Sequence, residues 1–563
     1  VAANAPAAEV DDGKAAKYDR IRLDSNQLRK VGGDGQLHEW FPTAVDAKGA
    51  DVNLLRLYGF DVLADDLKSD PERIKTAVDR GFSLIPKLTQ AYTEEDVAKQ
   101  VKEIESYPFK DAVAFWMIGE GLGRNRQLQA REDELARTRK LITAIRGMPP
   151  RFSRLTTGIV EGDLPLYARS PGNLDAIGIN LNHWGAGQDP LEFYQYLIQR
   201  SRLTTRSNAG QSYGAWLPPS ASESLRRNIW GEQPPPSWGV PRVLPEQLRL
   251  MTYMALSAGY RGLGFLGDAD LTRKVGKALL IEMALLNMEI DLMETFLARS
   301  GSSIPLYSIY DPDPPSIPPP GSNSRTKVPV YKEFAPKPFH RAASISVDRG
   351  GALLLLADYS MFAQYQPHQM AAQHLVVRAV LPESAQAFAI SPGGVEVLDR
   401  ERAPGGTNLS LPEFDVTSMI LSTTDMDLKD RIEAAIHRAR PMAVDLAIEQ
   451  ATLMYEEVAQ GHGRLAADGH TIRTEEDELK NRTLSLTKPI DEVEQLLAKA
   501  EASIQSAREA RAREDFALAW AEARRAHRPL RILAYSHWVK AFVAFNKRSE
   551  EHTSELQSHS DLV

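Results

Sequence analysis

The chain has 563 residues, of which 43% are hydrophobic and 25% charged, and its formal net charge at pH 7 is −8. A chain of this length exceeds one ordinary domain, and its interspersed acidic and basic residues leave no basic face of the kind that binds nucleic acid. Cysteine is absent, which excludes disulfides, thiolate metal sites and a cysteine nucleophile.

Residues 1–37 are expected to form an N-terminal segment with a β-hairpin. The stretch 21–41 reads IRLDSNQLRKVGGDGQLHEWF, with a glycine-rich turn at 32–35. Because this stretch directly precedes the next domain, we expect the hairpin to close the lower mouth of that domain.

Residues 38–300 alternate short apolar runs with helical patterns. This alternation is typical of βα units around a parallel sheet, and eight units are present. Helices are expected at 71–80, 93–106 and 245–258, which are followed by Gly81, Tyr107-Pro108 and Gly259. The sequence therefore predicts a (β/α)8 barrel with strands within 40–45, 60–65, 82–88, 113–119, 154–160, 174–181, 212–217 and 260–267.

The rest of the chain changes composition twice. A proline-rich linker is expected at 301–327, which includes DPDPPSIPPPGSNS, and a small β-sandwich is expected at 328–425. Residues 426–547 have helical spacing and predict two or three long antiparallel helices, the first kinked at Pro441. Their charged faces are read as solvated surface, with a protein-partner surface as the alternative. No apolar run approaches the length of about 20 residues that spans a bilayer.

Residues 548–563 are set apart from this pattern. The letters RSEEHTSELQSH at 548–559 resemble the translation of a sequencing adaptor. The first residue is Val1, without a Met or a signal peptide. We expect the natural chain to continue past Lys547 and the adaptor-like tail to pack against nothing.

In a (β/α)8 barrel the chemistry takes place at the carboxyl ends of the strands. Reading the eight strand ends in order gives a short set of polar and aromatic candidates. They are Asp46, Asp65, Asp66, Lys87, Glu120, Glu161, Asp163, Asn182, His183, Trp184, Trp216, Asp268 and Asp270.

Glu120 is the first candidate, because WMIGEGLG places a carboxylate just beyond the fourth strand between glycines. This run resembles the strand-four motif of clan A glycoside hydrolases, in which an Asn-Glu pair supplies a sugar contact and the general acid/base. The stretch PEQLRLMTYMALSAGYRGLGFLG, with Gln247 and Arg249, is similar to β-galactosidase-like members. The resemblance covers about half the chain and implies a barrel that acts on oligo- or polysaccharides, with extracellular or periplasmic location.

The chain departs from that family at two positions. Gly119 replaces the family's Asn, and the seventh strand, in QSYGAWLPPS, lacks the nucleophilic Glu; Glu223 lies too far along the loop to replace it. A glycosidase needs a second carboxyl group. Asp268 is the candidate, because strands four and eight face each other across the mouth; a helix cap or loop role is its alternative.

Further residues would complete a sugar site. Trp184 and Trp216 offer flat faces for sugar rings, and Asn182, His183 and Glu161 offer hydrogen bonds. Each of these residues has a structural alternative as rim packing or surface. We expect no metal and no cofactor, because His183 has no partner His at ligand spacing and the glycines at 119–123 do not fit a dinucleotide motif.

The sequence is compatible with two functions. The first is a glycoside hydrolase with Glu120 as general acid and Asp268 as base. The alternative is a catalytically degenerate barrel that binds glycans or acts as a scaffold in the cell envelope. The missing strand-seven carboxylate and the long helical region favour the alternative. A purely structural role of the helices after residue 426 is a third hypothesis.

Overall fold

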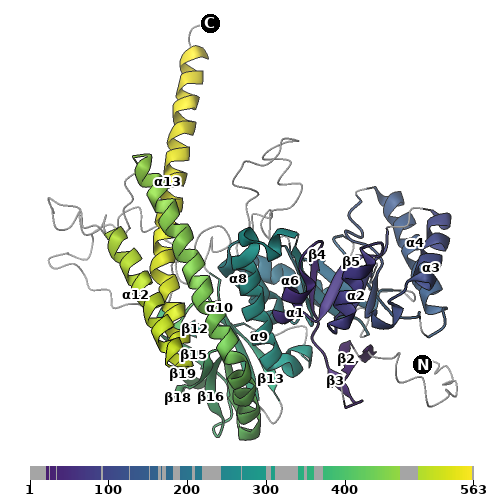
Figure 1. Ribbon diagram of the computed structural model, residues 1–563, viewed down its shortest axis with the longest axis horizontal. Helices are drawn as coiled ribbons and strands as arrows, with labels where there is room; N and C mark the ends of the chain where they lie inside the picture. Colours follow the sequence, from purple (N-terminus) through teal and green to yellow (C-terminus); the bar gives the residue numbers. More distant parts are fainter. Residues whose placement is uncertain are drawn as a thin grey trace.

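The computed structural model describes most of the chain, including all the predicted strands of the barrel (Figure 1). The described residues are 21–24, 26–32, 34–89, 93–125, 127–150, 152–162, 167, 173–181, 190–205, 210–218, 243–267, 269–299, 306–310, 340–347, 351–359, 372–469 and 492–560.

The predicted barrel is confirmed. Eight strands close in the order β10-β11-β4-β5-β6-β7-β8-β9, and every neighbouring pair is parallel. Each strand overlaps one predicted apolar run, which reflects burial on both faces, and only β4 and β5 extend past the end of their runs, by two residues and one residue. The strands are β4 (Thr43–Ala47), β5 (Val62–Asp66), β6 (Ser83–Lys87), β7 (Phe115–Met117), β8 (Leu155–Ile159), β9 (Ala176–Asn180), β10 (Ser212–Leu217) and β11 (Leu263–Gly267).

The barrel helices begin and end where the sequence signals predicted. Thr93 and Asp96 form a reciprocal capping box at the start of α3. Gly81 and Gly259 follow α2 and α8 with φ of 84° and 83°, a left-handed conformation that favours glycine. The helices are α1 (Val52–Leu57), α2 (Pro71–Asp79), α3 (Glu94–Ser106), α4 (Leu128–Arg146), α6 (Pro190–Thr205), α8 (Pro245–Ser257) and α9 (Lys277–Arg299).

Two hydrophobic clusters separate the inside of the barrel from its outer layer. Strand residues such as Val45 and Leu63 pack with the helices, whereas Ala44, Ala64 and Ile85 pack inside the barrel. Side chains alternate between the two faces of a strand, so a residue two positions after an inward one also points inward. Residues at the carboxyl ends of the strands that keep this alternation therefore also point into the barrel.

The N-terminal segment is a three-stranded antiparallel sheet and not the single hairpin that the sequence predicted. β1 (Ile21–Asp24), β2 (Gln27–Val31) and β3 (Leu37–Glu39) pair in chain order. A second turn forms at Asn26, whose φ of 75° is one that Asn tolerates. Leu28 is buried with the barrel's interior residues, so the sheet does cover the lower mouth as expected.

The region after the barrel contains a β-sandwich, as predicted. Nine antiparallel strands join in the order β17-β16-β20-β14-β13-β12-β15-β19-β18, and residues of both halves share one core. β12 lies inside the range expected to be linker, and it connects the two halves by pairing with β13 and β15. The strands are β12 (Leu306–Tyr310), β13 (His340–Val347), β14 (Gly351–Asp358), β15 (Ala372–Ala379), β16 (Gln386–Ser391), β17 (Gly394–Val397), β18 (Asp399–Ala403), β19 (Gly406–Phe414) and β20 (Thr417–Thr423).

Three long helices follow the sandwich, as predicted: α10 (Met426–Ala467), α12 (Glu492–Ala512) and α13 (Phe516–Ser560). They pack closely through buried alanines such as Ala447, Ala507 and Ala523. α10 continues through Pro441. The last turns of α13 extend away from the other elements (Figure 1). The side chains after Lys540 lie outside the described part, so the packing of Leu556 stays a prediction. Among the described residues, we find no helix with the length and apolar character of a membrane span.

A buried ionic network joins the barrel, the sandwich and the helices. Arg249 of α8 donates to Glu282 at 2.5 Å and to both oxygens of Glu289 at 2.8 and 2.9 Å, and all three side chains are at most 8% exposed. Arg249 also donates to Thr417 of β20, and Gln450 of α10 donates to Glu282 at 2.5 Å. We call this network the junction cluster. Arg249, which the sequence likeness singled out, therefore connects domains.

Candidate functional site at the barrel mouth

The top layer of the barrel interior is charged. Asp46, Asp66 and Lys87 stand two positions after Ala44, Ala64 and Ile85, which point into the barrel. They therefore point toward the barrel axis at the carboxyl ends of β4, β5 and β6. Glu120 joins them from the loop that follows β7. We call these four residues the mouth cluster: Asp46, Asp66, Lys87 and Glu120.

Lys87 is the centre of the mouth cluster. Its Nζ donates to Asp46 Oδ2 at 2.8 Å and lies 3.4 Å from Glu120 Oε1 and 3.9 Å from Asp66 Oδ1. Because the first two contacts share one nitrogen, the two carboxylate oxygens of Asp46 and Glu120 are at most about 6.2 Å apart. The four side chains can therefore contact one small ligand at the same time.

Burial divides the mouth cluster into a deep pair and a rim pair. Asp46 and Lys87 are 14% and 19% exposed, whereas Asp66 and Glu120 are 49% and 48% exposed. Asp66 also pairs with Lys48 at 2.9 Å. The deep pair fixes the floor of the site, and the rim pair is open to a ligand.

The electrostatics follow this division. Burial raises the pKa of Asp46, against the attraction of Lys87, and the negative charges of Glu120 and Asp66 add to the rise. Burial alone would lower the pKa of Lys87, but Asp46 and Glu120 outweigh it, so the pKa of Lys87 is raised and the ammonium persists. The hydrogen bond from Lys48 lowers the pKa of Asp66. Of the two aspartates, Asp46 thus holds a proton more readily than Asp66.

The loop that carries Glu120 is held by backbone pairing to β8. Leu122 forms a parallel bridge with Val160, and Gly121 and Gly123 have φ of 73° and 77°. A Cβ atom on Gly119 would lie 2.9 Å from Leu122, so the Asn of the resembling family would fit here only if Leu122 moved. The glycine at 119 is therefore consistent with the local packing.

Glu161 is placed beside this loop and engages Arg124. The guanidinium of Arg124 donates two hydrogen bonds to the Glu161 carboxylate, at 2.6 and 2.8 Å. Glu161 is 25% exposed, and Arg124 is 73% exposed. This bidentate pair does not include a member of the mouth cluster, and it explains Glu161 as a residue that supports the loop.

Trp216 lies inside the barrel and is only 5% exposed. A Cβ atom on Gly264 would overlap its ring, and one on Gly178 would lie 2.7 Å from its Nε1. The indole therefore fills the space that two glycines leave on neighbouring strands. With its ring enclosed in this way, Trp216 has no open face for a sugar.

The remaining predicted site residues, Asn182, His183, Trp184 and Asp268, lie outside the described residues. The described end of β10 carries Leu217 and Pro218 and no carboxylate, in agreement with the sequence. Among the described residues, no group of three or more His, Cys, Asp or Glu side chains is arranged to hold a metal ion.

The mouth cluster opens into a cavity of about 490 Å³. Glu120, Lys87 and Asp66 line it, together with apolar side chains such as Leu67, Leu88 and Met117. This volume is within the usual range for small-molecule sites. A larger cavity, of about 860 Å³, lies between the sandwich and α13.

Sequence reasoning named Asp46, Asp66 and Lys87 as strand ends but did not select them as a site. The positions of these three residues in their strands could have identified them as site residues. Each stands two residues after a small or apolar residue in a buried strand, so its inward direction could have been inferred from alternation. Glu120, which was selected, does join them.

Comparison with known proteins gives a fold-level likeness only. No protein-family model matches the sequence, and no curated protein matches it. Matching solved structures include a GH27 β-L-arabinopyranosidase from Geobacillus stearothermophilus, with 8% identity over 68% of this chain and 97% of that chain and a TM-score of 0.39. An α-L-fucosidase from Paenibacillus thiaminolyticus has 9% identity over 69% and 100% of the two chains, with a TM-score of 0.39.

A third match, β-glucuronidase 2 from Bacteroides uniformis, has 11% identity over 70% of this chain and 47% of that chain, with a TM-score of 0.35. All three are glycoside hydrolases. Because identities and scores of this size do not identify a site, we base the functional proposal on the side chains at the barrel mouth.

Proposed function

We propose that the barrel mouth binds an oligo- or polysaccharide and that the protein is a glycoside hydrolase with Glu120 as general acid. The observation that carries the proposal is the convergence of two carboxyl groups, Glu120 and Asp46, on Lys87 at the carboxyl end of the barrel, where Lys87 and Glu120 line an open cavity. This end of a (β/α)8 barrel is where catalysis takes place.

Glycosidic bond hydrolysis requires two carboxyl groups. One protonates the leaving oxygen, and the other attacks the anomeric carbon or activates a water molecule. Glu120 is on the rim, where a glycosidic oxygen would arrive, and Asp46 is on the floor. In this proposal Asp46 takes the role that the sequence gave to Asp268. The upper limit of about 6.2 Å refers to one oxygen of each group, so it is compatible with the spacing of both retaining and inverting enzymes.

The remaining members of the mouth cluster suit a polyhydroxylated ligand. Carboxylates accept hydrogen bonds and an ammonium donates them, so Asp66 and Lys87 can together engage neighbouring hydroxyl groups. Leu67, which is partly exposed, provides apolar surface for the carbon face of a sugar ring. The ligand would replace the contact between Lys87 and Glu120 and leave Glu120 able to act on it.

The alternative is a degenerate barrel that binds glycans without cutting them. One observation favours it: Lys87 already pairs with both carboxyl groups, and the described end of β10 offers no nucleophile. Binding and turnover therefore have to be measured separately. Secretion and a protein partner on the C-terminal helices stay predictions.

The test compares three purified proteins on a panel of oligosaccharides. Binding is measured by calorimetry and hydrolysis by the release of reducing ends. Glu120→Gln is expected to lower turnover by about 100-fold or more and to retain binding, because an amide cannot donate the required proton. Glu105→Gln removes an exposed carboxylate on α3 and is the matched control, with turnover unchanged.

Each result decides between the hypotheses. Binding by the wild-type protein without release of reducing ends would reject hydrolysis and support the degenerate barrel. Equal turnover by Glu120→Gln and the control would reject Glu120 as the acid. Failure of the wild-type protein to bind any glycan on the panel would reject a carbohydrate ligand.

A further inference from the structure

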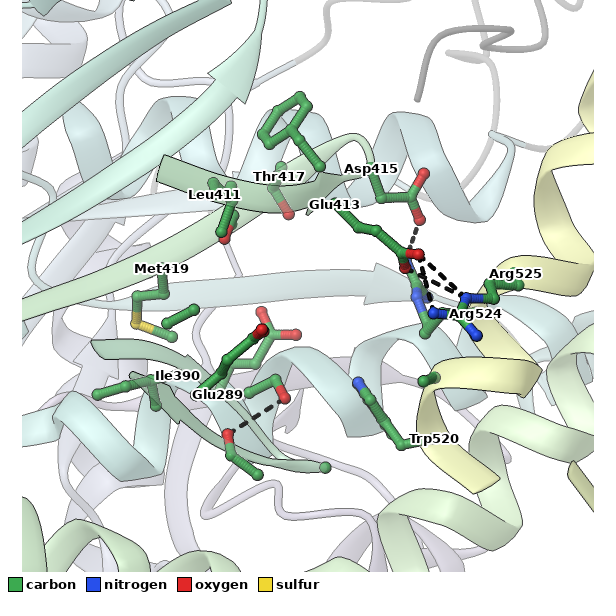
Figure 2. A pocket seen from close by; sticks show the side chains of 18 of the residues that line it. Glu289, Ile390, Leu411, Glu413, Asp415, Thr417, Met419, Trp520, Arg524 and Arg525 are labelled. Atoms are coloured by element: carbon green, nitrogen blue, oxygen red, sulfur yellow. Dashed lines mark hydrogen bonds and ion pairs between the residues drawn. The ribbon is translucent and has the colours of Figure 1, made fainter. Parts of the chain in front are cut away.

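A cavity larger than the one at the barrel mouth is formed by other elements of the chain. It has a volume of about 860 Å³ and lies between the sandwich strands β16, β17, β19 and β20 and the helix α13. Figure 2 shows its two walls, with the strands on one side and α13 on the other. We call it the sandwich–helix cavity.

The α13 wall of this cavity is rich in arginine. Arg524, Arg525, Arg528 and Arg531 recur along one side of the helix and all line the cavity. Arg524 and Arg531 both pair with the single carboxylate of Asp415, the former at 2.6 Å. Two guanidinium groups on one carboxylate leave a positive charge uncompensated.

The remaining arginines of the wall pair with carboxylates, with the exception of Arg528. Arg525 pairs with Glu413 at 2.9 Å, and Arg249 pairs with Glu289 at 2.8 Å. Glu396 on β17 and Arg528 on α13 are both exposed and have no ion-pair partner among the described residues. Arg525 also pairs with Glu522 at 2.7 Å and Arg249 with Glu282 at 2.5 Å, so Arg528 is the lining arginine whose charge remains available to an anionic group.

Trp520 provides an aromatic surface one turn before Arg524. Figure 2 shows its indole extending from α13 toward the strands. A Cβ atom on Gly393 would overlap this ring, so the glycine is what permits its position. The opposite wall is apolar and includes Ile390, Leu411 and Met419. The cavity thus combines an arginine row, an aromatic ring and an apolar wall.

We propose that the sandwich–helix cavity binds a small anionic ligand with an apolar or aromatic body, independently of the barrel mouth. Such a ligand would place its carboxylate, phosphate or sulfonate group at Arg528 and Arg524. Its apolar body would lie between Trp520 and the wall formed by Ile390 and Met419. The volume of about 860 Å³ is within the range of pockets that enclose ligands of this size.

The preference of the sandwich–helix cavity for an anionic ligand is tested with two fluorescent probes that differ in one group. 1-Anilino-8-naphthalenesulfonate carries a sulfonate, and N-phenyl-1-naphthylamine is its neutral counterpart. We expect the sulfonate probe to bind more tightly, with energy transfer from tryptophan. Arg528→Gln should weaken sulfonate binding on the order of fivefold and leave the neutral probe unchanged, because one exposed charged contact contributes about 1 kcal/mol.

Two matched controls accompany this variant. Arg513→Gln removes an exposed arginine outside the cavity lining, and Arg528→Lys keeps the charge. Both should bind the sulfonate probe like the wild-type protein, within about twofold. If Arg528→Gln and Arg513→Gln have equal effects, or if both probes bind equally well to the wild-type protein, the anionic selectivity is wrong.

The position of the ligand beside Trp520 is tested with substitutions at two neighbouring glycines. Gly393→Ala should displace Trp520 and weaken binding of both probes on the order of tenfold, with loss of energy transfer. Gly394→Ala is the control, because its Cβ would meet only Arg440, at 3.8 Å. Equal binding by the two folded variants would place the probe elsewhere and overturn the proposed site.

Discussion

The mouth cluster and the junction cluster use the same kinds of group in opposite ways. Each surrounds one cation with carboxylates, Lys87 in the barrel mouth and Arg249 at the contact between domains. The side chains of the Arg249 ion pairs are at most 8% exposed, whereas Glu120 at the mouth is 48% exposed. Exposure to water thus distinguishes the two clusters more than their composition does.

The choice of cation matches this difference. The planar guanidinium of Arg249 donates in fixed directions and satisfies Glu289 with two hydrogen bonds. The Lys87 ammonium is a compact charge whose contacts range from 2.8 to 3.9 Å. A ligand can replace the longer contacts at little cost, whereas Arg249 and its two carboxylate partners are almost fully buried. We therefore assign a structural role to the junction cluster and a functional role to the mouth cluster.

The largest expected effect on stability is at the junction. Arg249→Leu leaves Glu282 and Glu289 buried without their cation, and we expect a loss of about 3–5 kcal/mol in the free energy of unfolding. Urea unfolding followed by circular dichroism measures this loss. A change below about 1 kcal/mol would mean that the network does not hold the domains together.

A smaller effect is expected where the helical region meets the junction. Gln450 donates to Glu282 at 2.5 Å from α10. Gln450→Leu leaves one carboxylate oxygen without its donor and should lower the free energy of unfolding by about 2 kcal/mol. Thr452→Ala, two residues farther along α10, is the control for a contact outside the junction cluster, because its hydroxyl donates to Ile448 within the helix and accepts from the exposed Arg508 of α12. Equal losses in the two variants would argue against a specific role of Gln450.

An effect on stability smaller than that of Gln450 is expected at the contact between His462 and His537. Their ring nitrogens lie 3.4 Å apart between α10 and α13, and burial, with His462 nearby, lowers the pKa of His537 to about 4. The unfolded chain binds this proton near pH 6.5, so stability is complete above that pH and is lost as the pH falls toward about 4.

His537→Gln should therefore reduce the acid sensitivity of the protein. Allowing for partial exposure, we expect the wild-type protein to lose about 1 kcal/mol more than the variant between pH 7 and pH 4.5. Urea unfolding at the two pH values measures the difference. Identical pH dependence in the two proteins would exclude His537 as the titrating group.

The smallest effect on stability is expected at the mouth. Lys87→Met leaves carboxylates that water can reach or that can take up a proton, so the free energy of unfolding should fall by less than about 1 kcal/mol. Glycan binding should be lost in the same variant. A loss of 3 kcal/mol or more would make the mouth cluster a structural element like the junction and would remove the contrast between them.

The barrel could be predicted from the sequence because its signals are local. Runs such as 60–65 and 82–88 are short, apolar and followed by helices with clear ends, and burial on both faces makes each of them a strand. Glu120 was selected for the same reason, since it directly follows a strand. The sandwich and the long helices were predicted from alternation and helical spacing.

The parts that escaped prediction depend on contacts distant in sequence. Arg249, Thr417 and Gln450 meet only after three regions have packed together, and no periodicity signals this. Trp216 stands near the carboxyl end of a strand like a site residue, yet Gly178 and Gly264 make room for its ring inside the barrel. β12 was assigned to a linker because its proline-rich neighbours dominate the composition.

The most direct test of the central claim is a crystal structure of Glu120→Gln soaked with the oligosaccharide that the wild-type protein binds most tightly. We predict that a sugar hydroxyl lies within hydrogen-bonding distance of Lys87 and that a glycosidic oxygen lies beside residue 120. A sugar bound only outside the mouth, with Lys87 still paired to Asp46 and no ligand in the cavity above them, would contradict the account.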